Sequence, residues 1–306
     1  MKFIGIDLGW SSGASGLCCL VWENNQLQLT DLDCKLSTVD ILEWVDQRVP
    51  EPEPGLIAVD APTLIPNATG MRLPDKQTHR YFGRYHAGCY PANLNSRFAS
   101  HTVGFGNSLE MRGFMHAPMM IPQRCDRYQI EVFPHPAMIN LFGLSRILKY
   151  KKGKLGDRRL ELIKLRQYIV EILPNLEPSL SLKSDFWILS EPLDIFIEKL
   201  TAKSSKLFKA IEDQLDAIIC AYIGAHWWYW GCDRNLVLGV STDPVTEAYA
   251  NGYIIIPNHP SVNQITDVGA IHKSPLQISH HISEISEIRG SNPPSTETLK
   301  PDVIDL

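Results

Sequence analysis

The chain opens with MKFIGIDLGWSSGASG (residues 1–16), an apolar run that contains one aspartate and continues into a glycine-rich turn. The part KFIGIDLG (2–9) is rich in Ile and Leu, which predicts a buried β-strand. Asp7 lies near the end of this strand. A carboxylate there can bind a metal ion, approach a nucleotide phosphate or cap the turn, and the rest of the sequence has to decide among these roles.

Further strands follow the turn. ASGLCCLVWE (14–23) and QLQLTDLDCKL (26–36) predict two strands that continue the first as an antiparallel meander. GLIAVDAP (55–62) is continuously apolar, as expected for a central strand that is covered on both faces. It ends in Asp60, so a second predicted strand carries an aspartate at its end.

Three helices are predicted. TVDILEWVDQRV (38–49) follows the N-cap Ser37, and GDRRLELIKLRQYIVEIL (156–173) is amphipathic. SSKLFKAIEDQLDAIICAYIGAHWWYWG (204–231) becomes more apolar towards its end, and its apolar part (217–230) is too short to span a bilayer. Its aromatic end is expected to pack in the core. The inward face of the first helix is expected to consist of Val39, Leu42, Val45 and Val49.

The segment 63–127 interrupts this regular pattern. It is dense in Gly, Pro, Asn, Arg and His, which predicts a loop-rich insertion with short helices over one end of the sheet. YQIEVFPHPA (128–137) then predicts a strand that carries Glu131 and is stopped by two prolines. His135 follows that strand, where it is expected to be structural or to assist proton transfer.

The predicted domain spans residues 1–257 and ends in the short strand GYIIIP (252–257). Residues 258–306 are rich in Ser, Pro, Asn and His, which predicts a flexible C-terminal tail. Asp7 interrupts the apolar N-terminus before a signal-peptide core can form. The seven cysteines have no CxxC spacing, so we expect reduced thiols, no zinc site and a cytoplasmic protein.

The composition is that of a globular protein. Hydrophobic residues make up 44% of the 306 residues, and the net charge is −5. This charge argues against a protein that binds nucleic acid through a global basic field, but it leaves a local basic patch open.

Carboxylates recur where the predicted strands end. Asp7, Asp60 and Glu131 lie on three separate strands, and Asp213 and Asp216 lie three residues apart on the long helix. Burying several carboxylates together is costly unless a cation neutralises them. Mg²⁺ and Mn²⁺ prefer oxygen ligands, and two such ions can stabilise the attacking and leaving oxygens of a phosphoryl displacement. We therefore expect a site with two Mg²⁺ or Mn²⁺ ions.

Other roles for these acids stay open at this stage. Strand-end aspartates also cap turns, and Asp213 can simply lie on a solvated helix face. Glu131 can form a salt bridge with Arg124 or Arg127 instead of binding a metal ion.

The order of the predicted elements, β-β-β-α-β-α-β-α, resembles the ribonuclease H-like fold. More narrowly, the chain resembles the DUF429 family of predicted nucleases with that fold. The matching motifs, in order over residues 2–257, are IGIDLGW, IAVDAPT, RCDRYQIEVFPHPA, YKKGK with DRRLELIKL, EDQLDAIICAYIGAHWW and GYIIIP. The resemblance implies a mixed α/β sheet with helices on both faces. It also implies that the acidic site residues are Asp7, Asp60, Glu131 and Asp216.

One segment of the chain is strongly basic. RILKYKKGKLGDRRLELIKLR (146–166) carries nine Lys or Arg residues against two acidic ones. Basic side chains beside an acidic metal site suit a substrate that bears phosphate. Lys151 is the best candidate for such a contact, and Arg80, Arg124 and Arg127 are further candidates. The alternatives are a solvated basic helix face and surface ion pairs.

These features together predict a hydrolase: a metal-dependent nuclease or phosphodiesterase that acts on nucleic acid or a nucleotide. One alternative is a non-catalytic binding or regulatory protein that retains the fold. Another is an actin-like ATPase or kinase, because IDLGWSSG (6–13) resembles a first phosphate loop. The chain has neither the second phosphate loop nor the adenosine motif of that superfamily.

Overall fold

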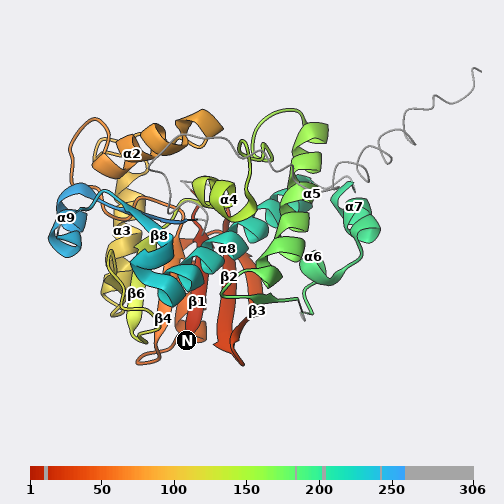
Figure 1. The fold of residues 1–306 in the computed structure, drawn as a ribbon, viewed down its shortest axis with the longest axis horizontal. Helices are drawn as coiled ribbons and strands as arrows, with labels where there is room; N and C mark the ends of the chain where they lie inside the picture. Colours follow the sequence, from red (N-terminus) through yellow and green to blue (C-terminus); the bar gives the residue numbers. More distant parts are fainter. Residues whose placement is uncertain (10–12, 183–184, 202–204, 242, 259–306) are drawn as a thin grey trace, which may run out of the picture. The chain divides into compact units, whose positions relative to one another are not determined.

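The computed structural model describes residues 1–9, 13–182, 185–201, 205–241 and 243–258. Within these residues, seven strands form one mixed sheet in the order β5-β6-β4-β1-β2-β3-β7 (Figure 1). The strands are β1 (Lys2–Asp7), β2 (Ser15–Glu23), β3 (Gln26–Lys35), β4 (Gly55–Val59), β5 (Met115–His116), β6 (Arg127–Glu131) and β7 (Leu180–Ser181).

The strand directions bring three predicted site residues to one edge of the sheet. β1, β2 and β3 form the expected antiparallel meander, whereas β4 pairs parallel to β1 and β6 pairs parallel to β4. Asp7 is the last residue of β1, Asp60 directly follows β4, and Glu131 is the last residue of β6. The carboxyl ends of parallel strands meet at the same edge, so these acids lie on one side of the molecule.

Helices cover both faces of this sheet. Their bounds are α1 (Thr38–Arg48), α2 (Leu73–Phe82), α3 (Ala99–Glu110), α4 (Pro134–Phe142), α5 (Leu155–Ile172), α6 (Trp187–Ser190), α7 (Leu193–Thr201), α8 (Ser205–Trp230) and α9 (Pro244–Asn251). Helix α8 crosses one face of the sheet, with α4 and α5 beside it (Figure 1). Short 3-10 turns are η1 (Gly83–Tyr85), η2 (Leu173–Asn175) and η3 (Gly231–Arg234).

Alternate residues of β1 enter two different hydrophobic layers. Phe3 packs in the layer beneath α8, whereas Ile4 and Ile6 pack on the other face with Trp44 of α1 and Phe105 of α3. Successive side chains of a strand point to opposite faces, so a strand buried on both faces is apolar throughout. This explains why β1 and β4 are continuous apolar runs.

Glycines let α8 lie directly on the strands. A Cβ atom added to Gly5 would lie 2.0 Å from the carbonyl oxygen of Ala217, and one added to Gly16 would lie 1.9 Å from that of Asp213. Small residues on the helix, such as Ala221, complete this contact. The close approach carries Asp213 and Asp216 to the strands that bear the other acids.

The Gly5→Ala substitution is expected to lower the free energy of unfolding by about 3 kcal/mol, at the upper end of overpacking costs, because the clash is with backbone. Gly104→Ala in α3 is the matched control. Its added Cβ meets no atom within 4 Å, so we expect no loss or a gain of up to about 1 kcal/mol. Urea denaturation of both variants measures the difference, and equal stabilities would contradict this packing.

The inward face of the first helix differs from the prediction. Val39 is 64% exposed, and the inward face of α1 is formed by Ile41, Leu42, Trp44 and Val45. Val39 lies about 200° around the helix from Ile41, so the two cannot share one face. Val49, directly after α1, is buried as expected.

The C-terminal strand of the described part belongs to a separate sheet. β9 (Ile254–Pro257) pairs antiparallel with β8 (Asn235–Leu238), and it reaches the main sheet through one isolated bridge from Ile255 to Val132. Residues 259–306, most of the predicted tail, lie outside the described residues. None of the described helices is long and apolar enough to cross a membrane.

Candidate active site

Two of the predicted acidic residues pair with the ammonium group of Lys151, and a third lies near them. Its Nζ lies 2.7 Å from Asp216 Oδ2 and 3.4 Å from Asp7 Oδ2. Asp60 lies close enough for the charges of Lys151, Asp7 and Asp216 to act on its pKa. The cluster therefore draws its side chains from β1, the end of β4, α8 and the basic segment after α4.

Main-chain and side-chain contacts hold this cluster in place. The backbone N–H of Asp60 donates to the carbonyl of Ile6 at 2.9 Å, which extends the pairing of β4 with β1 to the acidic residue. The Tyr150 hydroxyl donates to Asp216 Oδ1 at 2.6 Å. Asp216 is fully buried, and its Oδ2 pairs in charge with Lys151 but accepts no hydrogen bond from the described residues.

Burial and mutual repulsion shift the protonation of the cluster. Burial raises the pKa of Asp216 to about 6, with Lys151 opposing and Asp7 adding to this rise. Burial likewise raises the pKa of Asp60 well above its usual range. Burial would lower the pKa of Lys151, but Asp216 and Asp7 raise it well above its usual range. One ammonium thus pairs with two carboxylates, with a third carboxyl group close by, and the surplus of acidic groups favours a further cation.

Asp213 is near this cluster but has a different partner. Its Oδ1 lies 2.6 Å from Lys209 Nζ, and its Oδ2 is buried without a hydrogen bond to the described residues. Burial and the charge of Asp7 raise the pKa of Asp213 to about 7. The alternative of a solvated helix face is wrong, because Asp213 is only 1% exposed.

Glu131 forms its salt bridge with Arg72. The guanidinium donates from Nη1 to Oε2 and from Nη2 to Oε1, both at 2.7 Å. The alternative pairing with Arg124 or Arg127 is wrong, because Arg127 begins β6 and Glu131 ends it. Glu131 pairs with Val59, the residue before Asp60, but its two oxygens bind a guanidinium.

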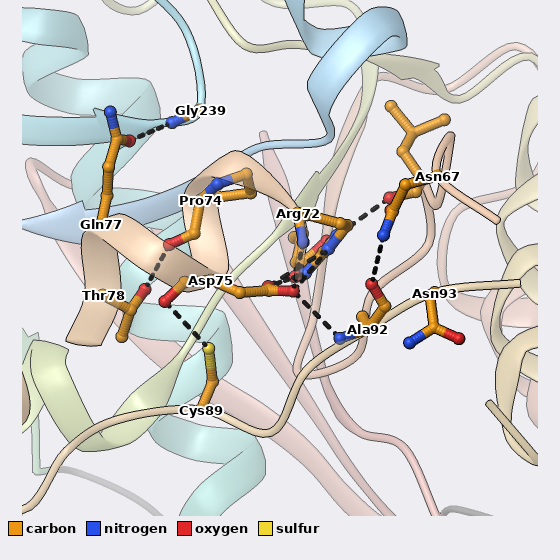
Figure 2. Close-up of polar contacts among 12 residues, drawn as sticks. Asn67, Arg72, Pro74, Asp75, Gln77, Thr78, Cys89, Ala92, Asn93 and Gly239 are labelled. Carbon is orange, nitrogen blue, oxygen red and sulfur yellow. Dashed lines mark hydrogen bonds and ion pairs between the residues drawn. The ribbon is translucent and has the colours of Figure 1, made fainter. Parts of the chain in front are cut away.

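The same arginine joins Glu131 of the sheet to the start of α2. Figure 2 shows its contact with Asp75 and that of Asp75 with Ala92. Arg72 also donates to Asp75, and Asp75 Oδ2 accepts the backbone N–H groups of Arg72 at 3.1 Å and of Ala92 at 3.0 Å. The motif RLPD (72–75) could have indicated this structure, because Pro in the first turn and Asp three residues on are typical of a helix start. Its partner Glu131, 59 residues away, had no such signal.

Three of the basic candidates lie elsewhere. Arg127 donates to the backbone carbonyls of Glu53 and Arg112 at the start of β6. Arg124 is exposed and lies 4.0 Å from an aspartate oxygen of its own loop, and Arg80 is exposed on α2. Among the four predicted phosphate-binding residues, Lys151 alone joins the acidic cluster.

A cleft of about 710 Å³ opens beside the cluster. Its lining comes from the carboxyl ends of β1, β4 and β6, from the insertion and from residues 147–153, and it includes Asp60, Lys151 and Glu131. His135 also lines it, and burial with the charges of Lys151 and Lys152 lowers its pKa to about 3. This histidine is therefore neutral at physiological pH.

The oxygen ligands of the cluster fit a hard divalent cation. Among the described residues, no three His, Cys, Asp or Glu side chains are grouped so that they could hold a metal ion as they stand. Mg²⁺ usually takes only one or two carboxylates and fills its other positions with water and substrate phosphate. Asp7 and Asp216, which already share one cation, supply that number.

Comparison with known families confirms the family resemblance. The family described as "Protein of unknown function (DUF429)" matches residues 5–236. The chain belongs to the DUF429 family. The matched range of this DUF429 protein contains the whole acidic cluster and Lys151. No curated protein and no solved structure matches the chain.

Proposed function

We propose that this DUF429 protein is a metal-dependent phosphodiesterase that hydrolyses a phosphodiester bond in nucleic acid or in a nucleotide. The observation that carries the proposal is that Asp7 and Asp216 pair with one cation, Lys151, with Asp60 close enough for their charges to act on it. These carboxylates come from separate elements, and such a set is costly to bury without a cationic partner.

The arrangement of the sheet supports a ribonuclease H-like fold within this proposal. That resemblance implied an antiparallel meander, then parallel strands, with acids on the first strand, the fourth strand and a late helix. The observed order β3-β2-β1-β4-β6 and the positions of Asp7, Asp60 and Asp216 agree with it. Fold alone does not imply function, so the chemistry of the cluster has to carry the rest.

Each residue of the cluster has a role in this reaction. Asp7, Asp60 and Asp216 would hold two Mg²⁺ or Mn²⁺ ions, which when bound would activate water and stabilise the leaving oxygen. Tyr150 orients Asp216 through its hydrogen bond. Lys151 neutralises charge on the phosphate, because its ammonium lies in the cluster and lines the cleft.

The bond changes balance without a side-chain nucleophile. The water oxygen bonds to phosphorus as the ester P–O bond breaks, the leaving oxygen gains a proton from solvent, and the attacking water loses one to solvent. His135 is not suited to general-base catalysis, because its pKa of about 3 leaves it a weak base.

One observation favours a second function, non-catalytic binding by a protein that retains the fold. Lys151 already pairs with Asp7 and Asp216. Such a protein would bind its ligand without any metal-dependent turnover, so a cleavage assay separates the two functions.

The test is a cleavage screen with labelled single-stranded, double-stranded and hybrid nucleic acids and with a chromogenic phosphodiester. Each substrate is incubated with Mn²⁺, with Mg²⁺ and with EDTA. The proposal predicts turnover that requires the metal ion. No turnover on any substrate, with Mn²⁺ bound to the protein by calorimetry, would favour the binding function.

The Lys151→Met substitution is expected to destabilise the metal-free protein by about 1–3 kcal/mol, less than a fully buried pair because Lys151 is 31% exposed. It removes the counterion of Asp216, so Mn²⁺ should raise the melting temperature of the variant more than that of the wild type. Lys149→Met is the control. An equal effect of Mn²⁺ on both variants would argue against metal binding by this cluster.

A further inference from the structure

We propose that the cleft beside Lys151 binds one small phosphodiester with an apolar or planar group, built on a single nucleotide or a group of that size, and that this molecule is the substrate of the site in place of a polynucleotide strand. The inference deepens the proposed function and rests on it for the reaction. Three features of the cleft carry it: its enclosure, its rim and its chemical lining.

The cleft is enclosed by segments that are far apart in the sequence. The ends of β1, β4 and β6 contribute residues such as Leu8 and Val132, and the insertion contributes Phe98. Its volume of about 710 Å³ lies in the range of pockets that bury a single small ligand. Proteins that bind single strands instead use a groove that follows the backbone over several nucleotides.

A hydrogen bond joins two of these segments at the rim. Lys152 Nζ donates to the hydroxyl of Tyr90 at 3.0 Å, and the ammonium lies 5.2 Å from the centre of the tyrosine ring. Both residues are exposed and both line the cleft, so their contact lies at its edge. It connects the insertion with the basic segment. A small ester fits behind this contact, whereas a polymer would have to separate the two segments.

The lining has two kinds of surface. Lys149, Lys151 and Lys152 supply positive charge from one short segment, next to the carboxylates that would hold metal ions. Most of the remaining exposed lining is apolar, and it includes Phe133 and Ile254. A ligand that matches both surfaces carries a phosphate at one end and an apolar or planar group at the other. Nucleoside phosphates have this chemistry.

The buried charges of the cleft do not alter this match. Arg72, Asp75 and Glu131 also line the cleft, but they form an ion-paired network with one another. The guanidinium is therefore engaged by two carboxylates, and Lys151 likewise pairs with Asp7 and Asp216. Lys149 and Lys152 line the cleft and are the cations that we assign to the phosphate.

The experiment compares binding of thymidine 5′-monophosphate and of a 20-nucleotide oligothymidylate by isothermal titration calorimetry with Mn²⁺. We expect the mononucleotide to bind, and the oligonucleotide to bind no more tightly per molecule. Lys152→Ala should weaken binding of the mononucleotide by about tenfold, because a charged contact is lost. Lys154→Ala is the control, because Lys154 belongs to the same basic segment but does not line the cleft. It should leave the affinity for the mononucleotide unchanged.

Two further measurements separate this inference from the proposed function. Tyr90→Ala opens the rim and is expected to increase binding of the oligonucleotide. The inference would be overturned if the wild type bound the oligonucleotide at least tenfold more tightly than the mononucleotide. Equal effects of Lys152→Ala and Lys154→Ala would also overturn it.

The p-nitrophenyl ester of thymidine 5′-monophosphate then reports turnover. If the mononucleotide binds but the ester is not hydrolysed, the proposed phosphodiesterase activity is contradicted and the proposed ligand of the cleft is not. If oligonucleotides are cleaved and the mononucleotide does not inhibit this cleavage, the proposed ligand of the cleft is contradicted and the phosphodiesterase activity is not.

Discussion

The rate of metal-dependent hydrolysis is expected to be about 100- to 1000-fold lower in the Asp7→Asn variant, and the variant is expected to remain folded. The amide has the shape of the carboxylate but no charge, so it binds a divalent cation poorly, and losses of this size follow when one stabilising group of a transition state is removed. Asp7 suits the experiment better than Asp216, because its side chain is 12% exposed and that of Asp216 is fully buried.

Stability provides the second measurement for this variant. Asp7 raises the pKa values of Asp216 and Asp213 by repulsion, so its removal should lower both and should not unfold the protein. Asp33→Asn is the matched control, because Asp33 is on the surface of β3 and pairs with Lys35 at 2.8 Å. Both variants change the net charge equally. Full Mn²⁺-dependent activity in Asp7→Asn would show that the cluster is not the active site.

The positions of the acidic cluster could be predicted because local patterns determine them. Asp7 and Asp60 each terminate a continuous apolar run, and parallel strands place such ends at one edge of a sheet. Asp216 lies among small residues that allow a helix to approach the sheet. The sequence near each residue and the order of the strands are sufficient to predict these positions.

The partners of these residues depend on contacts that are distant in sequence. Arg127 is close to Glu131 in the chain, but four residues of strand separate them by about 13 Å. Arg72 lies in an insertion without periodicity, and only the folded chain brings it to Glu131. Lys151 was expected to contact phosphate, but its place among the carboxylates depends on how α8 docks.

The Arg72→Met substitution is expected to lower the free energy of unfolding by about 3–5 kcal/mol, because it leaves Glu131 and Asp75 as buried carboxylates without their shared partner. Arg112→Met is the matched control. Its pair with Asp46 is partly exposed, and such pairs contribute less than about 1 kcal/mol. Equal losses in urea denaturation would contradict the role of Arg72. The double variant Arg72→Met/Glu131→Gln should recover part of the loss, because it removes one unpaired charge.

The pH dependence of the stability loss in Arg72→Met tests whether Glu131 is the group that causes it. Burial raises the pKa of Glu131 from its ordinary 4.5 to about 7, and Arg72 opposes this rise. The folded state therefore binds more protons than the unfolded state between these values, and the contribution of Glu131 to stability is lost as the pH rises through about 7. Without Arg72 the pKa of Glu131 rises further, which extends the loss to higher pH. The difference in stability between wild type and Arg72→Met should therefore be smaller at pH 5 than at pH 8, whereas that of Arg112→Met should not follow this trend.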